Sequence, residues 1–458
     1  MRKIETNAKK REDGEARRQS WLIFMCFFAY TVSYVSRYSY NCNIVAIRSA
    51  YNVSNAEAGL VGTFYFFAYG AGQVINGLLC KRYNKKYCVA ASLFISAAIN
   101  AAAFCSPKFG AYKWLWLVNG AALSVLWSSL VAVLAEHLSE SYLNRGVLIM
   151  SMSVAAGTCI TYGAGAAFNA LNVYRYSFLL AAALAAGFSF AWVISYNKVT
   201  SASYVPRGKD TEKCEGENAA KENDAKENAA PCESKTGGDD GKKKRTFGAW
   251  GTFYVLAVPG LLAAIINLIK DGLNTWVPQI LKSTFGYGNG LSVALTLVLP
   301  LVGMGGSAAA LLLNKKIKDF LALCGMLFTF GTFCTAGITG VLQTGSTRIA
   351  AGILTIALFG AISLIAHAVN SVFTSIAPIM LRDKYDSGML AGMLNGCAYV
   401  GSTVSAYGLG TLADKQGWLG VFVLLLCFSA AAALVSFAVY LLGKRVERRR
   451  IKTQKRYR

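Results

Sequence analysis

The sequence predicts an all-α membrane protein with twelve transmembrane helices, arranged as two pseudo-symmetric six-helix bundles. Three observations support this prediction. Of the 458 residues, 55% are hydrophobic and only 15% are charged, whereas soluble proteins have about 25% charged residues. Twelve apolar runs each approach or exceed the roughly 20 residues that a spanning helix needs. One polar segment divides these runs into two sets of six.

The first set follows a polar and basic N-terminal tail, residues 1–20, and forms a predicted N-terminal bundle, residues 21–196. The apolar run after the tail has the length of a full span and is followed by further spans. It therefore does not have the pattern of a cleavable signal peptide. The six predicted spans are residues 21–48, 57–80, 86–106, 113–135, 146–170 and 175–196.

The polar segment, residues 197–248, contains the near-repeat GENAAKENDAKENAA followed by GGDDGKKKR. A segment of this composition cannot bury enough apolar surface to offset the entropy lost on ordering. We expect it to be a mobile cytoplasmic linker between the two bundles.

The second set forms a predicted C-terminal bundle, residues 249–442, and a basic C-terminal tail follows at residues 443–458. The six predicted spans are residues 249–282, 290–313, 319–341, 348–380, 387–412 and 418–442. Three short patterns recur in both halves in corresponding spans, which indicates a duplicated unit with a binding site between the repeats. They are Arg37-x-x-x-Asn41 with Lys270-x-x-x-Asn274, residues 162–165 with 407–410, and Gly70-x-Gly72 with Gly303-x-Gly305.

Basic residues predict the orientation of the chain. The formal net charge is +23, and 37 of the 46 Lys and Arg residues fall in tails and loops on one side if the N-terminus is cytoplasmic. Cytoplasmic segments are enriched in Lys and Arg. We therefore expect both termini to be cytoplasmic, and we interpret the positive charge as a membrane feature that does not indicate nucleic-acid binding.

Two cations lie deep inside predicted spans. Arg37 is about sixteen residues into the first span and Lys270 about twenty residues into the seventh. A charge near the bilayer centre costs about 2.5–3.5 kcal/mol on insertion scales, so it faces the bundle interior or a wet cavity. The repeat places these two cations on opposite walls of one cavity. Asp271 is the one deep carboxylate of the predicted spans, and a pair with it is the alternative to a binding role for Lys270. Because adjacent helical residues point about 100° apart, Asp271 could instead meet a cation on a neighbouring helix, in a structural or gating role.

Polar residues recur at helical spacing around both cations and predict a pore-like space, because a polar stripe in lipid meets another helix or water. Four spans carry such stripes. They are Tyr30, Tyr34, Arg37, Tyr38 and Asn41; Tyr65, Tyr69, Gln73 and Asn76; Asn267, Lys270 and Asn274; and Ser363, His367, Asn370, Ser371 and Thr374.

Two facing cations indicate an anionic ligand. Arginine offers a planar fork for phosphate or carboxylate, and lysine offers a point charge. His367 is a candidate donor or proton site, although a hydrogen-bonded packing role is nearly as plausible. Trp127 and Tyr399 are candidates for shaping the cavity, and aromatic packing is an equal alternative.

Other classes of protein have little support. Twelve cysteines occur without a CxxC pair, so neither a zinc site nor a disulfide framework is predicted. Walker, HExxH and nucleophile-elbow motifs are absent from the sequence, which argues against ATP-driven transport and membrane catalysis. We expect no cofactor and no enzymatic activity.

The chain resembles the major facilitator superfamily, and within it the organophosphate:phosphate antiporters for glycerol 3-phosphate and hexose phosphates. The segment 77–86 is similar to the superfamily loop G-x-x-x-D-R-x-x-R/K, with Lys81 in place of the acid. Residues 392–401, then Asp414, Gly417 and Trp418, are similar to the eleventh helix and its outer end.

This resemblance implies a phosphate-binding role for Arg37, and it implies that Lys270 takes the place of the family's second arginine. It also implies cavity roles for Tyr30, Tyr34, Tyr69, Trp127 and Tyr399. Two departures reduce the charge of the site: Gln73 replaces a lysine, and the fifth helix lacks the family's histidine between residues 151 and 158.

We therefore expect a monomeric, multi-pass carrier in the plasma or inner membrane. It would move a small organic anion by alternating access in exchange for phosphate or another anion. The expected partners are this substrate and the lipid bilayer. A proton-coupled carboxylate symporter and a transporter-like sensor of organic anions are the alternatives.

Overall fold

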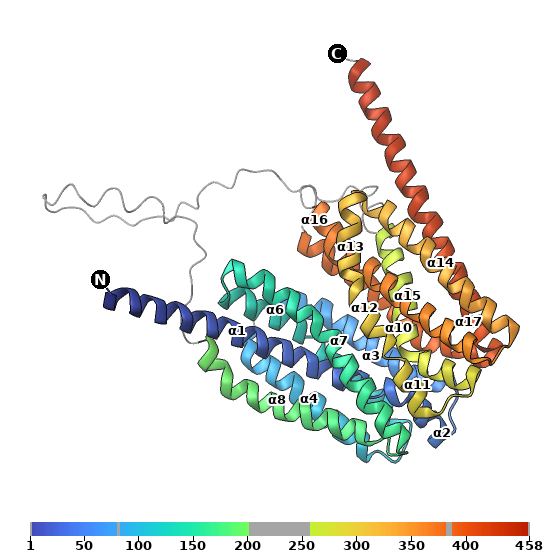
Figure 1. Ribbon diagram of the computed structural model, residues 1–458, viewed down its shortest axis with the longest axis horizontal. Helices are drawn as coiled ribbons and strands as arrows, with labels where there is room; N and C mark the ends of the chain where they lie inside the picture. The colour runs from blue at the N-terminus through green and yellow to red at the C-terminus, as the bar shows by residue number, and fades with distance from the viewer. Residues whose placement is uncertain (1, 80–82, 201–256, 382–386, 457–458) are drawn as a thin grey trace, which may run out of the picture.

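The computed structural model describes residues 2–79, 83–200, 257–381 and 387–456. Throughout these ranges the regular secondary structure is helical (Figure 1). The N-terminal half consists of α1 (Arg2–Tyr38), η1 (Asn41–Asn43), α2 (Ile44–Tyr51), α3 (Asn55–Leu79), α4 (Lys85–Cys105), α5 (Ala111–Leu123), α6 (Leu126–His137), α7 (Glu140–Ala170) and α8 (Tyr176–Thr200).

The C-terminal half begins at α10 and ends in one long helix, α17. It consists of α10 (Val258–Phe285), α11 (Asn289–Leu295), α12 (Val298–Gly303), α13 (Gly305–Lys316), α14 (Phe320–Thr344), α15 (Ile349–Ser371), the π-helical segment η3 (Val372–Ile376), α16 (Ala377–Met380) and α17 (Ser387–Arg456).

Within the described residues, nine helical segments are long and apolar enough to cross a membrane. One of them, residues 392–445, contains two predicted spans that meet at Gly417, where the backbone turns with φ 68° and ψ −179°. The predicted spans in α1 and α10 are not among the nine. Their polar residues, including Arg37 and Lys270, make these helices less apolar than the other spans.

Several predicted spans are broken helices, a feature that counting apolar residues cannot detect. The first span divides into α1, η1 and α2; the fourth divides into α5 and α6; and the eighth divides into α11, α12 and α13. The tenth span passes through the π-helical segment η3. Such breaks free backbone groups that neighbouring helices and side chains then satisfy.

Glycines allow the helices to approach closely, as the Gly-rich runs predict. A Cβ built on Gly401 of α17 would overlap the backbone carbonyl of Ala264 in α10. A Cβ on Gly59 of α3 would overlap the carbonyl of Ala406 in α17. The second contact joins the two halves.

Hydrogen bonds seal the halves together at the end of the molecule that carries α2 and α11. Asp414 of α17 accepts from the backbone N–H groups of Asn55 and Ala56 at 3.0 and 2.7 Å, at the N-terminus of α3. Thr63 Oγ1 donates to the carbonyl of Thr403 at 2.8 Å. Figure 1 shows the halves together at this end and apart at the end that carries α6 and α13.

Some expectations fall outside the described residues. The linker prediction, 197–248, overlaps the described chain only as far as Thr200, the last residue of α8. Residues 80–82, which include Lys81 of the loop motif, are also outside the described ranges.

Candidate functional site

Arg37 lies in the last turn of α1 and is only 6% exposed. Its guanidinium carbon lies 5.2–5.4 Å from the centroids of five aromatic rings. Aromatic faces attract a cation through the ring quadrupole. The five rings are those of Tyr34, Tyr38, Tyr65, Phe66 and Tyr69.

Neutral groups leave most of the hydrogen-bonding capacity of Arg37 unused. Its Nη1 donates to the hydroxyl of Tyr34 at 3.5 Å, a long contact, and its Nε is buried without a partner among the described residues. In that part of the chain, no carboxylate lies within ion-pair distance of Arg37. A buried guanidinium with free donors is suited to an anion.

Lys270 lies in the middle of α10, within a polar network. Its Nζ donates to Asn267 Oδ1 at 2.5 Å and lies 3.9 Å from Asp271 Oδ1. Asn267 Nδ2 then donates to Asn370 Oδ1 of α15 at 3.0 Å. Lys270 is thus partly compensated by a carboxylate of its own helix.

Asp271 is 3% exposed and is also bound from α17. Ser402 Oγ donates to Asp271 Oδ2 at 2.5 Å. The carboxylate therefore joins α10 to α17, while its other oxygen, Oδ1, lies 3.9 Å from Lys270 Nζ. Asp271 thus faces the lysine of its own helix, and its contact on the neighbouring helix is a serine hydroxyl and not a cation.

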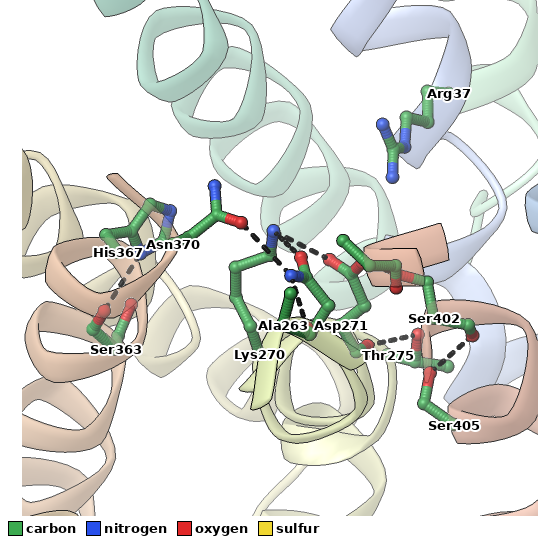
Figure 2. Close-up of polar contacts among 12 residues, drawn as sticks. Arg37, Ala263, Lys270, Asp271, Thr275, Ser363, His367, Asn370, Ser402 and Ser405 are labelled. Carbon is green, nitrogen blue, oxygen red and sulfur yellow. Dashed lines mark hydrogen bonds and ion pairs between the residues drawn. The ribbon is translucent and has the colours of Figure 1, made fainter. Parts of the chain in front are cut away.

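The two cations approach each other from opposite halves. Figure 2 shows Arg37 and Lys270 pointing toward one another from α1 and α10, with Asp271 beside Lys270. An anion between α1 and α10 would meet both cations.

Aromatic side chains surround the Arg37 side of this arrangement. The Tyr30 ring packs against Trp127 at 4.9 Å and against Tyr34 at 5.2 Å between centroids. Tyr69 of α3 packs against Tyr399 of α17 at 5.0 Å, so the aromatic group crosses between the halves. These rings are rigid walls with hydroxyl donors.

Two other predicted residues contact the opposite half. Gln73 Nε2 donates to the Tyr69 hydroxyl at 3.1 Å, and Gln73 Oε1 accepts from Asn395 of α17 at 2.7 Å. Asn41 Nδ2 donates to Thr275 Oγ1 of α10 at 3.0 Å. Asn41 therefore lies at the junction of the halves, where an exchange of hydrogen-bond partners would accompany any relative motion.

Tyr38 and Asn274 extend this junction beyond the two cations. The Tyr38 ring packs against Tyr162 of α7, with 6.1 Å between centroids. The Tyr162 hydroxyl donates to the backbone carbonyl of Asn274 in α10. Both predicted residues thus lie beside a contact between the halves.

His367 lies on α15, and Asn370 separates it from Lys270 in Figure 2. Its Nδ1 is 2.8 Å from the carbonyl of Ser363. A Cβ on Gly303 would come within 2.8 Å of that nitrogen, so the ring packs closely on α12. These contacts agree with the packing alternative for His367 and leave its Nε2 as the group that a ligand could meet.

Besides Phe66, whose ring faces Arg37, three residues near the site were not predicted: Asn395, Ser402 and Thr275. Asn395, Tyr399 and Ser402 follow one another at i, i+4 and i+7 on α17, which is the same helical spacing that identified the other stripes. Thr275 is adjacent to Asn274 and bonds to Asp271 O of the preceding turn at 2.8 Å. The spacing on α17 was a signal that could have found two of the three.

The fold and these charged helices define a membrane carrier of two repeats, and comparison with known families gives the same class. The model of the Major Facilitator Superfamily matches residues 26–378. The chain belongs to this superfamily.

The names of similar proteins are consistent with the resemblance to organophosphate antiporters. Sugar phosphate exchanger 3 of Bos taurus is 22% identical over 397 residues, covering 82% of this chain and 78% of the relative. A probable hexose phosphate transport protein of Chlamydia pneumoniae is 22% identical over 462 residues, covering 93% of each.

A solved structure supports the fold alone. The inward-facing, occupied form of a bacterial homologue of the human lysosomal transporter Spinster superposes with a TM-score of 0.69 at 13% identity. It covers 92% of this chain and 96% of that chain. The twelve-helix prediction, with two six-helix bundles, is confirmed.

Proposed function

We propose that this chain is a secondary active exchanger of phosphorylated sugars or glycerol phosphate, working by alternating access against phosphate or another anion. The observation that carries the proposal is Arg37: a buried guanidinium with free donors, opposite Lys270, in a chain whose relatives carry names of sugar phosphate exchangers. A tetrahedral phosphate accepts from both cations at once, whereas a neutral sugar leaves Arg37 uncompensated.

The proposed orientation in the membrane rests on other residues, the Lys and Arg side chains of the tails and short loops. The basic tails and short basic loops place both termini in the cytoplasm of a plasma or inner membrane. The end with α6 and α13 then faces the cytoplasm, and the end sealed by Asp414 faces outside. The protein works as a monomer, with no cofactor, no nucleic acid and no enzymatic step.

Binding begins when the phosphate meets Arg37 and draws Lys270 away from its neighbours. Lys270 gives up Asn267 and the 3.9 Å approach to Asp271 for a charge-assisted bond to substrate. Asp271 keeps its bond from Ser402. Once the substrate neutralises the two cations, α1 and α10 close on it from the cytoplasmic side. The hydrogen-bonded seal between α3 and α17 then opens.

Asp271 acts in this scheme as an internal counter-anion for the empty carrier. Without it, two facing cations in low dielectric would oppose closure around an empty site. With it, the empty site holds one uncompensated cation rather than two. Exchange is therefore faster than net movement, but net movement is not forbidden.

Counterflow in proteoliposomes tests the function. Purified protein is reconstituted with internal glucose 6-phosphate, glycerol 3-phosphate, inorganic phosphate or a small carboxylate such as lactate, and uptake of labelled glucose 6-phosphate and of labelled phosphate is followed. We expect uptake with the three phosphorylated internal anions and little with the carboxylate or with empty vesicles.

Each rival function has its own outcome in this assay. Uptake of a carboxylate driven by an imposed proton gradient, without any counter-anion, would support a proton-coupled symporter. Saturable binding of the phosphorylated anion without any flux would support a sensor.

A further inference from the structure

A basic and aromatic cavity lies between α1 and α8, apart from the Arg37 site. Its volume is about 790 Å³. Arg17, Arg18 and Lys198 line it together with Trp21 and Phe24. In the proposed orientation it lies where both helices reach the cytoplasmic edge of the bilayer.

The three cations of this cavity are only partly neutralised. Arg18 is held in place: its Nη1 donates to the carbonyl of Val199 at 3.5 Å, and its Nη2 is 3.8 Å from Glu15. Arg17 and Lys198 are exposed and have no ion pair within the described residues. Among the side chains that the structure describes here, three cations therefore stand against one nearby carboxylate, Glu15.

An aromatic lane runs from this rim along the bundle surface. Trp21 stacks on Phe24 with 5.0 Å between centroids, and Phe24 meets Phe28 at 4.4 Å. Phe28 then packs on Phe188 of α8 at 6.4 Å. Trp21 and Phe24 are 48% and 44% exposed, so their faces are available to a ligand.

We propose that this cavity binds one anionic phospholipid of the cytoplasmic leaflet. The phosphate group meets Arg17, Arg18 and Lys198, because basic pockets between helices on this side attract anionic head groups. The acyl chains follow the lane from Trp21 to Phe188. A free phosphate would use the cations but leave the aromatic lane in contact with other lipid, so the combination favours a lipid.

Native mass spectrometry of the full chain tests this site directly. The protein is released from detergent containing phosphatidylglycerol or phosphatidylcholine, and retained lipid is counted by mass. The variant replaces Arg17, Arg18 and Lys198 with Gln. Because all three basic residues near the anionic surface are lost, we expect this variant to hold phosphatidylglycerol roughly 100-fold more weakly than the unaltered chain.

A matched control removes the same charge elsewhere on the cytoplasmic side. Lys315, Lys316 and Lys318, at the end of α13, are replaced with Gln. This control should retain one tightly held phosphatidylglycerol, as the unaltered chain does. Equal losses in both variants would overturn the proposal, because they would reflect net charge alone, and so would equal retention of phosphatidylcholine and phosphatidylglycerol.

Two further measurements distinguish a bound lipid from a bound soluble anion. The pair Trp21→Ala and Phe24→Ala should also weaken phosphatidylglycerol binding, although it removes no charge. Inorganic phosphate should raise the melting temperature of the unaltered chain and of the Arg17, Arg18 and Lys198 variant by the same amount. A phosphate effect lost in that variant, with lipid binding unchanged in the aromatic pair, would make this a soluble-anion site and overturn the assignment. The site shares no residue with the exchange mechanism, so its failure leaves the proposed function standing.

Discussion

The two intramembrane cations occupy corresponding places in the two repeats but have opposite surroundings. Arg37 is enclosed by five aromatic rings and has no carboxylate within ion-pair range in the described chain. Lys270 is surrounded by amide groups and has Asp271 at 3.9 Å. A duplicated sequence unit has thus produced one uncompensated charge and one compensated charge.

This difference suggests a division of labour in the proposed exchanger. Arg37 is a fixed site, because its neighbours hold it by packing and offer few alternative hydrogen bonds. Lys270 is a switchable site, because its long side chain can leave Asn267 and Asp271 for a substrate anion. Substitutions that change one cation, or one neighbour of a cation, test this division, and the largest effect is expected at the fixed cation.

Replacing Arg37 with Ala should have the largest effect. Truncating one partner of a buried charged pair costs about 2–5 kcal/mol, so we expect phosphate exchange to fall roughly 100-fold or more. Counterflow measures it, with protein level and melting temperature as controls. Exchange above half of the original rate would show that Arg37 is not part of the binding site.

Replacing Asp271 with Asn tests whether the compensation of Lys270 matters. The empty site would then contain two uncompensated cations, and like charges brought together in low dielectric oppose closure. We expect net efflux to fall roughly tenfold relative to exchange. The measurement is the ratio of efflux into anion-free buffer to efflux into phosphate buffer.

The matched control for this prediction is Asp319→Asn. Asp319 caps the N-terminus of α14, where its Oδ1 accepts from the backbone N–H groups of Leu321 and Ala322, and among the described residues it has no hydrogen bond or ion pair with Lys270 or Asp271. It should leave the efflux ratio unchanged. An unchanged ratio in Asp271→Asn as well would mean that the carboxylate serves only to join α10 to α17.

Replacing Lys270 with Arg makes the two cations chemically alike. A guanidinium can form two parallel bonds to a phosphate, whereas an ammonium acts as a point charge. We expect the KM for glucose 6-phosphate to fall several-fold, with a smaller change in maximal exchange. A rise in KM would indicate that the space beside Asn267 and Asp271 fits only the narrower lysine.

Replacing Tyr34 with Phe should have the smallest effect. The change removes the 3.5 Å bond to Arg37 but keeps the ring that faces the guanidinium. A neutral hydrogen bond contributes about 0.5–1.5 kcal/mol, and this one is long, so we expect a two- to threefold rise in KM. Tyr87→Phe, at a 60% exposed ring, is the control.

The fold and the depth of the two cations could be predicted from the sequence, because both depend on the free energy of placing residues in lipid. Apolar length identifies spans, and a deep charge must avoid lipid. Helical spacing of polar residues predicted Tyr34 and Tyr69, whose rings face Arg37, whereas Tyr399, which packs on Tyr69, was indicated by the family resemblance. Helix breaks such as those after Tyr38 and Leu123 depend on local packing, which apolar counting does not detect.

The relation between Lys270 and Asp271 could not be read from helical geometry alone. Adjacent residues project about 100° apart on a helix, which suggests separate environments. The lysine stem is long and flexible, however, and curves back to within 3.9 Å of the carboxylate. The bond from Ser402 to Asp271 joins residues 131 positions apart, a pairing that no local pattern predicts.

The hydrogen bonds between the two halves have a consequence for how this family can be studied. Asp414 binds the amide groups of Asn55 and Ala56, Thr63 binds the carbonyl of Thr403, and Tyr162 binds the carbonyl of Asn274. In each bond one partner is peptide backbone, which survives almost any substitution. Substitutions at these backbone partners thus need no compensating change in the other half, so correlated substitutions across homologues would report mainly side-chain pairs such as Asn55–Asp414 and Asn41–Thr275.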